Sequence, residues 1–228
     1  MQNKHEMLQK EQEIHFLNQK YELEKERKII IETLLSDLKH RTQNNLQTIC
    51  SLLHFQYNTL QDDKAKIAIQ SIENRIESIM MLHKLLDFKE STINIHVPTY
   101  FNNLLLYLID SYGLENKVKL IINIEDIDID FQKIVPLALL VNELVTNAFK
   151  YAYVNQISPL LQVKIYKSST DETLQLIVKD NGIHQNLELN FNGSSLGLKI
   201  VNLLSQQLKA KMNYQYQTGL EWTFDIPI

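Results

Sequence analysis

Cysteine, glycine, proline and long apolar runs are all scarce in this chain of 228 residues. The one cysteine, Cys50, excludes an intrachain disulfide and suits a reducing compartment. No apolar run approaches the ~18 residues that a membrane-spanning helix needs, and the polar N-terminus is unlike a signal peptide. We therefore expect a cytoplasmic chain, or the cytosolic part of a longer membrane-anchored protein.

An excess of charge of one sign is also lacking. The formal net charge is −4, which gives no electrostatic reason to expect nucleic acid or an anionic membrane as a partner. Of the residues, 44% are hydrophobic and 22% are charged. This is a globular composition, and the length suffices for one large domain or two small ones.

Residues 1–87 contain neither glycine nor proline and are rich in strong helix formers. Two series of positions spaced by seven, starting at Met7 and Lys10, are mostly apolar, with polar breaks at Lys10, Glu24 and Lys28. This spacing predicts a coiled coil or helical bundle. The breaks fit two interpretations, which are control of register and a marginally stable segment that relays a signal.

The stretch TLQDDKA (residues 59–65) interrupts this helix and offers Asp62 or Asp63 as the cap of a second one. Two long helices with a short polar connection predict an antiparallel hairpin. Wide apolar stripes on both helices would be left partly uncovered in a single hairpin, so we expect two copies to form a four-helix bundle, as a homodimer. The stripe on the second helix comprises Ile69, Ile72, Ile76, Ile79, His83 and Leu86.

After residue 89, the pattern predicts alternating helices and strands. A helix opened by Pro136 is expected to run to about Tyr153, and two period-two segments around residues 169–172 predict a β-hairpin. Helices on one side of a mixed sheet form an α/β two-layer sandwich. The other expected elements are helices at 99–112 and 195–208 and strands at 118–124, 211–217 and 220–228.

His40 falls opposite the apolar seam of the first helix, among polar residues. Asp37 and Asn44 lie one turn away on the same face. A neutral imidazole is a nucleophile near pH 7, and a nearby carboxylate can accept its ring N–H and orient it. An exposed histidine beside an aspartate is also common without any function. His83, on an apolar stripe, is by contrast expected to be a packing residue.

The second half of the chain contains several polar groups suited to a nucleotide. Glu143, Asn147 and Lys150 share one helix face, as an acid, an amide and an amine would around a polyphosphate and its metal. Asp180 ends a predicted strand just before Gly182. Ser195 and Gly197 open a helix whose N-terminal amides favour an anion. Taken separately, these groups have simpler explanations. The helix residues could form an ordinary polar helix face, and the residues around Gly182 could form a simple Asn-Gly turn.

These motifs, in this order, resemble those of sensor histidine kinases. KHRTQNNLQTICSLLHFQ is similar to the phosphoacceptor box of the HWE-related, type-2 subfamily, NELVTNAFKYA to the N box, DNG to the G1 box and SLGLKIV to the G2 box. The resemblance implies a dimerisation and histidine-phosphotransfer hairpin followed by an ATP-binding domain of the gyrase, Hsp90, kinase and MutL (GHKL, or Bergerat) type. We expect a signalling coiled coil at 1–30, the phosphotransfer domain at 31–92 and the ATP-binding domain at 93–228.

The resemblance also implies roles for individual residues. His40 would be phosphorylated from ATP and would pass the phosphoryl group to an aspartate in the receiver domain of a response regulator. Asp37 is the candidate general base, and Asn44 would position water for the reverse phosphatase reaction. Asn147 would bind Mg²⁺ with Glu143 one turn before it. The other nucleotide-binding positions are Lys150, Tyr151, Asp180, Gly182, Ser195, Gly197, Leu198 and Thr223.

Two positions depart from the family pattern. His184 replaces the second glycine of the G1 box, which would stiffen the start of the lid over the phosphates. Arg41 follows the phosphoacceptor where the larger kinase subfamily has an acid. Two alternatives therefore stand beside a kinase. One is a nucleotide-binding signalling scaffold without catalysis, and the other is an ATPase or serine-directed kinase that does not use His40.

Overall fold

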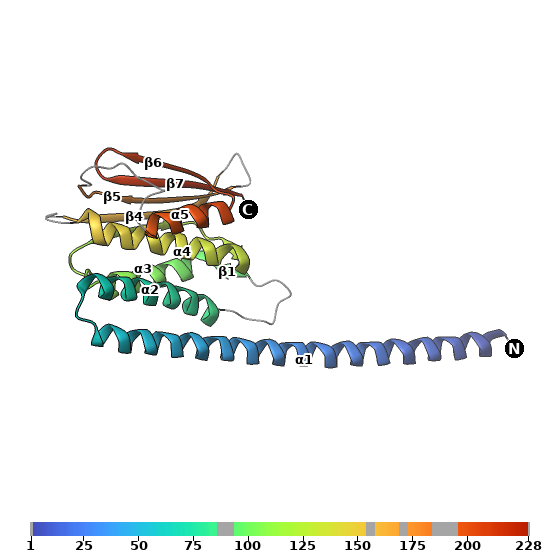
Figure 1. Cartoon of the computed structure of the whole chain (residues 1–228). Helices are drawn as coiled ribbons and strands as arrows, with labels where there is room; N and C mark the ends of the chain where they lie inside the picture. Colours follow the sequence, from blue (N-terminus) through green and yellow to red (C-terminus); the bar gives the residue numbers. More distant parts are fainter. Residues whose placement is uncertain (1, 86–93, 154–157, 169–172, 184–195, 228) are drawn as a thin grey trace.

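The computed structural model of the chain describes residues 2–85, 94–153, 158–168, 173–183 and 196–227, with side chains described from residue 15 onward except at 32 and 35. Two antiparallel helices, α1 (Gln2–Thr59) and α2 (Asp63–Leu85), form the predicted hairpin (Figure 1). Asp62 caps α2, since its Oδ1 accepts the Lys64 N–H at 2.9 Å. The sequence predicted this cap at Asp62 or Asp63.

The N-terminal half of α1 projects beyond the rest of the molecule (Figure 1). One stripe of α1 leaves large apolar side chains in water, although a helix normally buries such a stripe. Leu38, Leu52 and Phe55 are 59%, 62% and 67% exposed, respectively, and Leu34 is 58% exposed. The single chain therefore leaves an apolar surface on α1 uncovered.

The second half of the chain is an α/β sandwich built on a five-stranded sheet of order β2-β4-β5-β7-β6. Strand β2 pairs parallel with β4, and the other pairs are antiparallel. A separate pair, β1 and β3, was not predicted. The strands are β1 (Asn94–His96), β2 (Lys119–Ile124), β3 (Asp128–Asp130), β4 (Leu160–Lys167), β5 (Thr173–Asp180), β6 (Lys211–Tyr216) and β7 (Leu220–Pro227).

Three helices, α3 (Val97–Ser111), α4 (Phe131–Asn147) and α5 (Leu196–Gln207), lie on one side of this sheet, as predicted (Figure 1). Strands β4 and β5 alternate buried and half-buried residues, with the buried set facing these helices. The core contains Phe101, Leu140, Val163 and Phe224, and it extends to Leu82 on α2. The hairpin and the α/β sandwich therefore share one hydrophobic core.

Helix α4 begins earlier than predicted. Pro136 was expected to open it, but the helix begins at Phe131, where the Asp130 carboxylate accepts the Gln132 N–H at 2.8 Å. Pro136 lies inside the helix, and the loss of one backbone donor there does not end it. At its other end α4 continues into a π-helical turn, Ala148–Ala152. Such turns are often found at functional sites.

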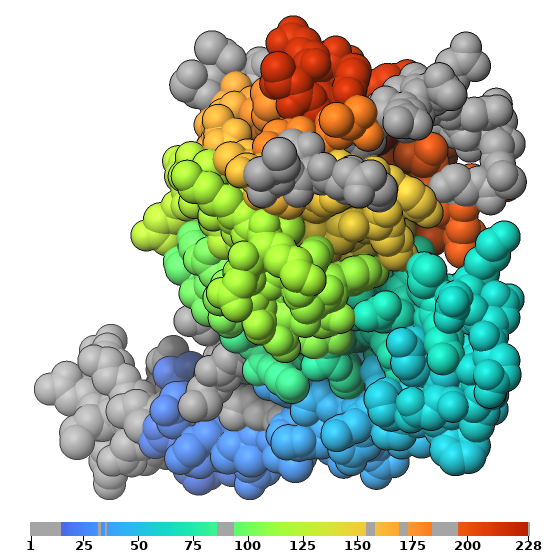
Figure 2. Space-filling view, turned by 90° about the vertical axis from the view of Figure 1, so that its left-hand side faces the viewer, coloured from blue at the N-terminus to red at the C-terminus, as the bar shows by residue number. Residues whose placement is uncertain are grey.

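The molecule is thus layered, with α2 between α1 and the α/β sandwich (Figure 1). In the side view the hairpin, in blue to cyan, runs below the green surface of α3, and the yellow to red surface of the sandwich lies above (Figure 2). No helix in the described ranges is long and apolar enough to cross a membrane.

Candidate functional site

The C-terminal part of α4 carries the predicted acid and amide. Glu143 is only 2% exposed, and its carboxylate is bound by Arg75 of α2. The Arg75 Nε–Oε1 distance is 2.5 Å and the Nη2–Oε2 distance is 3.0 Å. This two-point contact is the geometry that guanidinium and carboxylate groups favour. Arg75 was not singled out from the sequence, because nothing in the pattern of α2 indicates a partner 68 positions away.

Asn147 and Gly197 come together where α4 ends and α5 begins. A Cβ atom at Gly197 would lie 3.2 Å from Asn147 Oδ1 and 3.5 Å from Glu143 Oε2. Glycine therefore lets the first turn of α5 approach the polar side chains of α4 closely. The first turn of α5 and the Asn147 amide are thus direct neighbours. Leu198 is half-buried against the core.

Lys150 and Tyr151 lie in the π-helical turn that follows Asn147. Burial lowers the pKa of Lys150, while the nearby Glu143 carboxylate acts in the opposite direction and Arg75 lowers it further. Three charged side chains, two of them cationic, are thus near one another beside Asn147. Tyr151 is 63% exposed, so its ring is available to a ligand.

Asp180 is held in place at the end of β5. The side chain is 4% exposed, and its Oδ1 accepts the N–H groups of Gly182 and Leu220, at 2.8 and 3.3 Å. A Cβ atom at Gly182 would come within 2.2 Å of the carbonyl oxygen of Ala152. Only glycine fits there, and the contact brings Asp180 next to the π-helical turn.

Thr223 is not brought to this site. It pairs with Ile177 across the sheet, on the face opposite to the buried face that holds Val178, Asp180 and Trp222. Side chains alternate along β7, so a one-position difference places a residue on the other face. The residue of β7 that contacts Asp180 is Leu220, through its backbone N–H. Ser195 and His184 lie outside the described residues.

His40 is exposed on the polar face of α1, as predicted. Asp37, the candidate base, pairs instead with Arg41 at 2.8 Å, and both side chains are more than half exposed. Within the described part of the chain no hydrogen bond joins Asp37 to His40. Exposed ion pairs of this kind contribute little stability, about 0–1 kcal/mol, so Asp37 can exchange partners easily.

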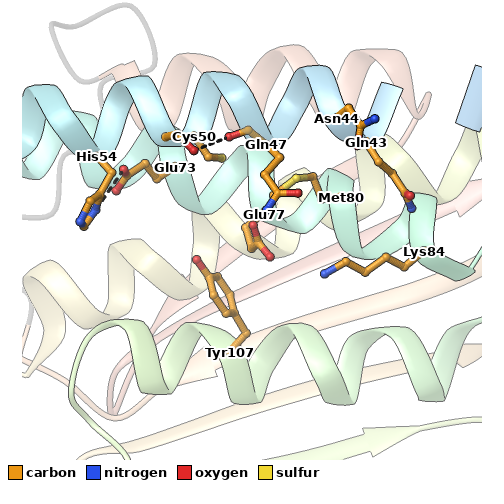
Figure 3. A pocket seen from close by; sticks show the side chains of 11 residues that line it. Gln43, Asn44, Gln47, Cys50, His54, Glu73, Glu77, Met80, Lys84 and Tyr107 are labelled. Carbon is orange, nitrogen blue, oxygen red and sulfur yellow. Dashed lines mark hydrogen bonds and ion pairs between the residues drawn. The ribbon is translucent and has the colours of Figure 1, made fainter. Parts of the chain in front are cut away.

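Asn44 lines a cavity of about 590 Å³ on the same side of α1 as His40. In Figure 3, Gln43, Asn44 and Gln47 of α1 lie across this cavity from Lys84 of α2 and Tyr107 of α3. Its acidic lining is partly desolvated, and burial raises the pKa of the Glu73 carboxyl. The cavity is a polar groove between the hairpin and the sandwich.

Comparisons with known proteins agree with this arrangement, in which a helical hairpin that carries His40 is followed by an α/β sandwich. Residues 37–112 match the family described as "Histidine kinase", and residues 132–228 match "Histidine kinase-, DNA gyrase B-, and HSP90-like ATPase". Together the two family models match most of the chain. The fold is therefore the GHKL ATPase fold joined to a phosphoacceptor hairpin.

Individual relatives support this assignment. The chain is 26% identical over 206 residues to Blue-light-activated histidine kinase 2 of Erythrobacter litoralis (strain HTCC2594), covering 87% of this chain and 58% of that protein. It is 23% identical over 203 residues to Sensor histidine kinase PdtaS of Mycobacterium tuberculosis (strain ATCC 25618 / H37Rv), covering 86% and 40%. The chain thus spans about half the length of the curated relatives it matches.

A solved structure shows the same fold. The histidine kinase domain of the Erythrobacter litoralis EL346 blue-light activated histidine kinase superimposes with a TM-score of 0.63 at 23% identity, covering 79% of this chain and 95% of that one. The chain belongs to the histidine kinase family.

Proposed function

We propose that the chain is the kinase part of a sensor histidine kinase, which uses ATP to phosphorylate its own His40 and passes the phosphoryl group to an aspartate of a response regulator. The observation that carries the proposal is the exposure of His40 on the polar face of α1, in the same chain as the polar site of α4, α5 and β5.

The site contains groups suited to both the adenine base and the phosphates of ATP. The buried Asp180 carboxylate, fixed by the Gly182 and Leu220 amides, suits the amino group of the adenine base. The π-helical turn carries Lys150 and Tyr151. The Lys150 ammonium would pair with phosphate charge, and the Tyr151 ring would contact the base or the ribose. Gly182 and Gly197 let their backbones approach Ala152 and Asn147 closely, which brings the parts of the site together.

The site also fits a magnesium ion. The Asn147 amide oxygen and the Glu143 carboxylate are oxygen donors of the kind that Mg²⁺ prefers. When bound, Mg²⁺ would neutralise charge on the phosphates. Glu143 would reach it only after leaving Arg75, because Arg75 now occupies both of its oxygens.

In the proposed reaction the neutral His40 imidazole attacks the γ-phosphorus in line. An N–P bond forms while the bond from the γ-phosphorus to the bridging oxygen breaks, and ADP leaves with that oxygen and its electron pair. Asp37 would orient the imidazole or take its remaining ring proton after leaving Arg41. Asn44 would position water for the reverse phosphatase reaction.

Two partners follow from the proposal. A second copy of the chain would cover the apolar stripe of α1 and form a four-helix bundle, and a response regulator receiver domain would accept the phosphoryl group from the exposed His40. A sensory part would lie in the remainder of a longer protein. A cytoplasmic location remains a prediction that rests on the single cysteine.

One observation favours a second candidate, a nucleotide-binding scaffold without kinase activity. Arg75 binds Glu143 and makes the acid unavailable to a metal or nucleotide. Such a scaffold would bind ATP but leave His40 unlabelled.

The first test is incubation with γ-labelled ATP and Mg²⁺, comparing wild type with His40→Gln. We expect acid-labile, base-stable label on wild type and a loss of more than about 100-fold in the variant, because no other side chain can take over the nucleophile's position. His54→Gln, which changes another exposed histidine of α1, is the matched control and should retain its label.

Equal labelling of wild type and His40→Gln would refute the proposal and point to a serine-directed kinase or an ATPase on the same fold. No label on either, with nucleotide binding intact, would favour the scaffold.

A further inference from the structure

Arginine is rare in this chain, with three residues, and one of them joins the hairpin to the ATPase domain. The Arg75 side chain is 19% exposed and Glu143 is 2% exposed, so their ion pair is largely shielded from water. A shielded pair is screened little by salt, and removal of one partner leaves an uncompensated buried charge. The Arg75–Glu143 contact is therefore a strong link between α2 and α4.

Polar contacts lie beside this link, in addition to the shared hydrophobic core that reaches Leu82. The Asn142 amide donates to the carbonyl of Asn74 at 2.9 Å, and the Tyr100 hydroxyl donates to the carbonyl of Ser78 at 3.0 Å. Polar contacts of this kind are typical of interfaces between parts that move relative to each other. Removal of one partner of the charge pair would therefore weaken the contact of α2 with the domain.

The link also fixes the position of the ATP site along the hairpin. Helices α2 and α4 run antiparallel, since Arg75 is opposite Glu143 and the His83 ring packs against the Phe131 ring at 5.5 Å. Asn147, beyond Glu143, therefore lies toward the turn of the hairpin. The phosphate end of the site is at the level of Arg75 or nearer the turn.

His40 is at the other end of the hairpin. The neighbouring Lys39 ammonium donates to the carbonyl of Lys84 at 3.3 Å, so His40 is at the level of Lys84. Nine residues of α2 separate Lys84 from Arg75, which corresponds to about 14 Å along the helix. In-line transfer needs reacting atoms about 3–3.5 Å apart.

Dimerisation does not remove this separation. In a four-helix bundle whose two-fold axis runs along the hairpins, the partner copy's phosphoacceptor is at the same height as His40 itself. While Arg75 binds Glu143, the phosphate site is therefore far from both phosphoacceptors.

We propose that the Arg75–Glu143 ion pair is an inhibitory latch, which holds the ATPase domain in a resting arrangement and must open before His40 is phosphorylated. The proposal rests on the proposed kinase function. Opening exposes Glu143 to water, to Mg²⁺ and to nucleotide, and frees the domain to move toward the open end of the hairpin.

The test uses Arg75→Ala and Arg75→Lys in the full chain, with Lys64→Ala as the matched control. Lys64 is an exposed cation on the same helix, away from the interface. Without Arg75 the docked state buries an unpaired carboxylate, so the equilibrium shifts to the undocked state. We expect Arg75→Ala to label His40 about ten-fold faster than wild type, Arg75→Lys to fall between them, and Lys64→Ala to match wild type.

A second readout does not depend on catalysis. Hydrogen exchange of peptides that cover residues 74–82 should be faster in Arg75→Ala than in wild type, because α2 loses its cover. If Arg75→Ala is poorly folded, Arg75→Lys gives the same comparison, because a lysine keeps the positive charge but cannot bind both carboxylate oxygens in the same planar geometry.

Slower labelling in both Arg75 variants, with an active wild type, would overturn the latch and assign Arg75 to holding the nucleotide. Unchanged labelling and unchanged exchange would also overturn it. Faster exchange with no label on any variant would support the contact as a clamp while removing the kinase function, so the two failures are distinguishable.

Discussion

Asp180 of the proposed nucleotide site shows how single residues fix a position, because it depends on two glycines that no other residue can replace. Gly219 has a φ of +123°, and a Cβ atom there would lie 1.9 Å from the carbonyl oxygen of Asp180. Few L-residues adopt that backbone conformation, and the overlap with backbone cannot be relieved by rotating a side chain. The turn between β6 and β7 therefore supports the carboxylate from outside the site.

Replacement of Gly219 by alanine should lower the free energy of unfolding by about 3–5 kcal/mol, through backbone strain and steric overlap together. Gly113→Ala is the matched control, because Gly113 also has a positive φ, +61°, but nothing within 4 Å of its Cβ position. That control should lose only about 1–2 kcal/mol. Urea denaturation monitored by tryptophan fluorescence measures both, and equal losses would contradict the steric argument.

Lys150 makes nucleotide binding sensitive to alkaline pH. Burial lowers the pKa of this ammonium group below the usual value for lysine, so it loses its proton, and its attraction for phosphate, earlier as pH rises. ATP affinity should therefore decline over a pH range that begins below the ordinary lysine pKa of about 10.4. The Lys150→Gln variant should bind ATP more weakly than wild type at the start of this range, and its ATP affinity should fall less as pH rises. Calorimetric titration across this range measures both, and parallel curves would exclude Lys150 from the phosphate site.

At the scale of elements, α1 has three sides with different roles. One face packs on α2, and the exposed stripe on another side contains Leu34, Leu38, Leu52 and Phe55. His40 and Asn44 lie on neither surface, but on the polar side that borders the cavity. A homodimer formed through the stripe would leave His40 accessible.

Introducing Leu38→Lys with Leu52→Lys should convert the dimer to a monomer, because charges would then face each other across the apolar seam. Light scattering after size exclusion should give twice 26.7 kDa for wild type and 26.7 kDa for the double variant. Ser36→Lys with Ser51→Lys adds the same charge away from the stripe and should stay dimeric. A monomeric wild type would remove the predicted four-helix bundle.

Most elements could be predicted from local pattern, because the helical hairpin, the β4–β5 hairpin and the β6–β7 pair each depend on neighbouring residues. Pro136 misled the prediction, since a cap at Asp130 starts α4 more than one turn earlier. Thr223 was placed with the site residues, although strand alternation turns it to the other face. Arg75 could not be found, because its partner is 68 residues away and no periodicity marks the pair.

At the scale of the whole molecule, a helix lies between the proposed nucleotide site and the helix that carries His40. Helix α2 separates α1 from the sandwich (Figure 1). The proposed ATP site lies toward the turn of the hairpin, away from His40. Movements of whole domains take microseconds to milliseconds, far longer than side-chain rotations. If the latch must open, each phosphorylation of His40 would require a large part of the protein to move through water, and solvent friction would resist that movement. Glycerol or sucrose, by thickening the medium, would slow such a kinase even where every chemical group is unchanged.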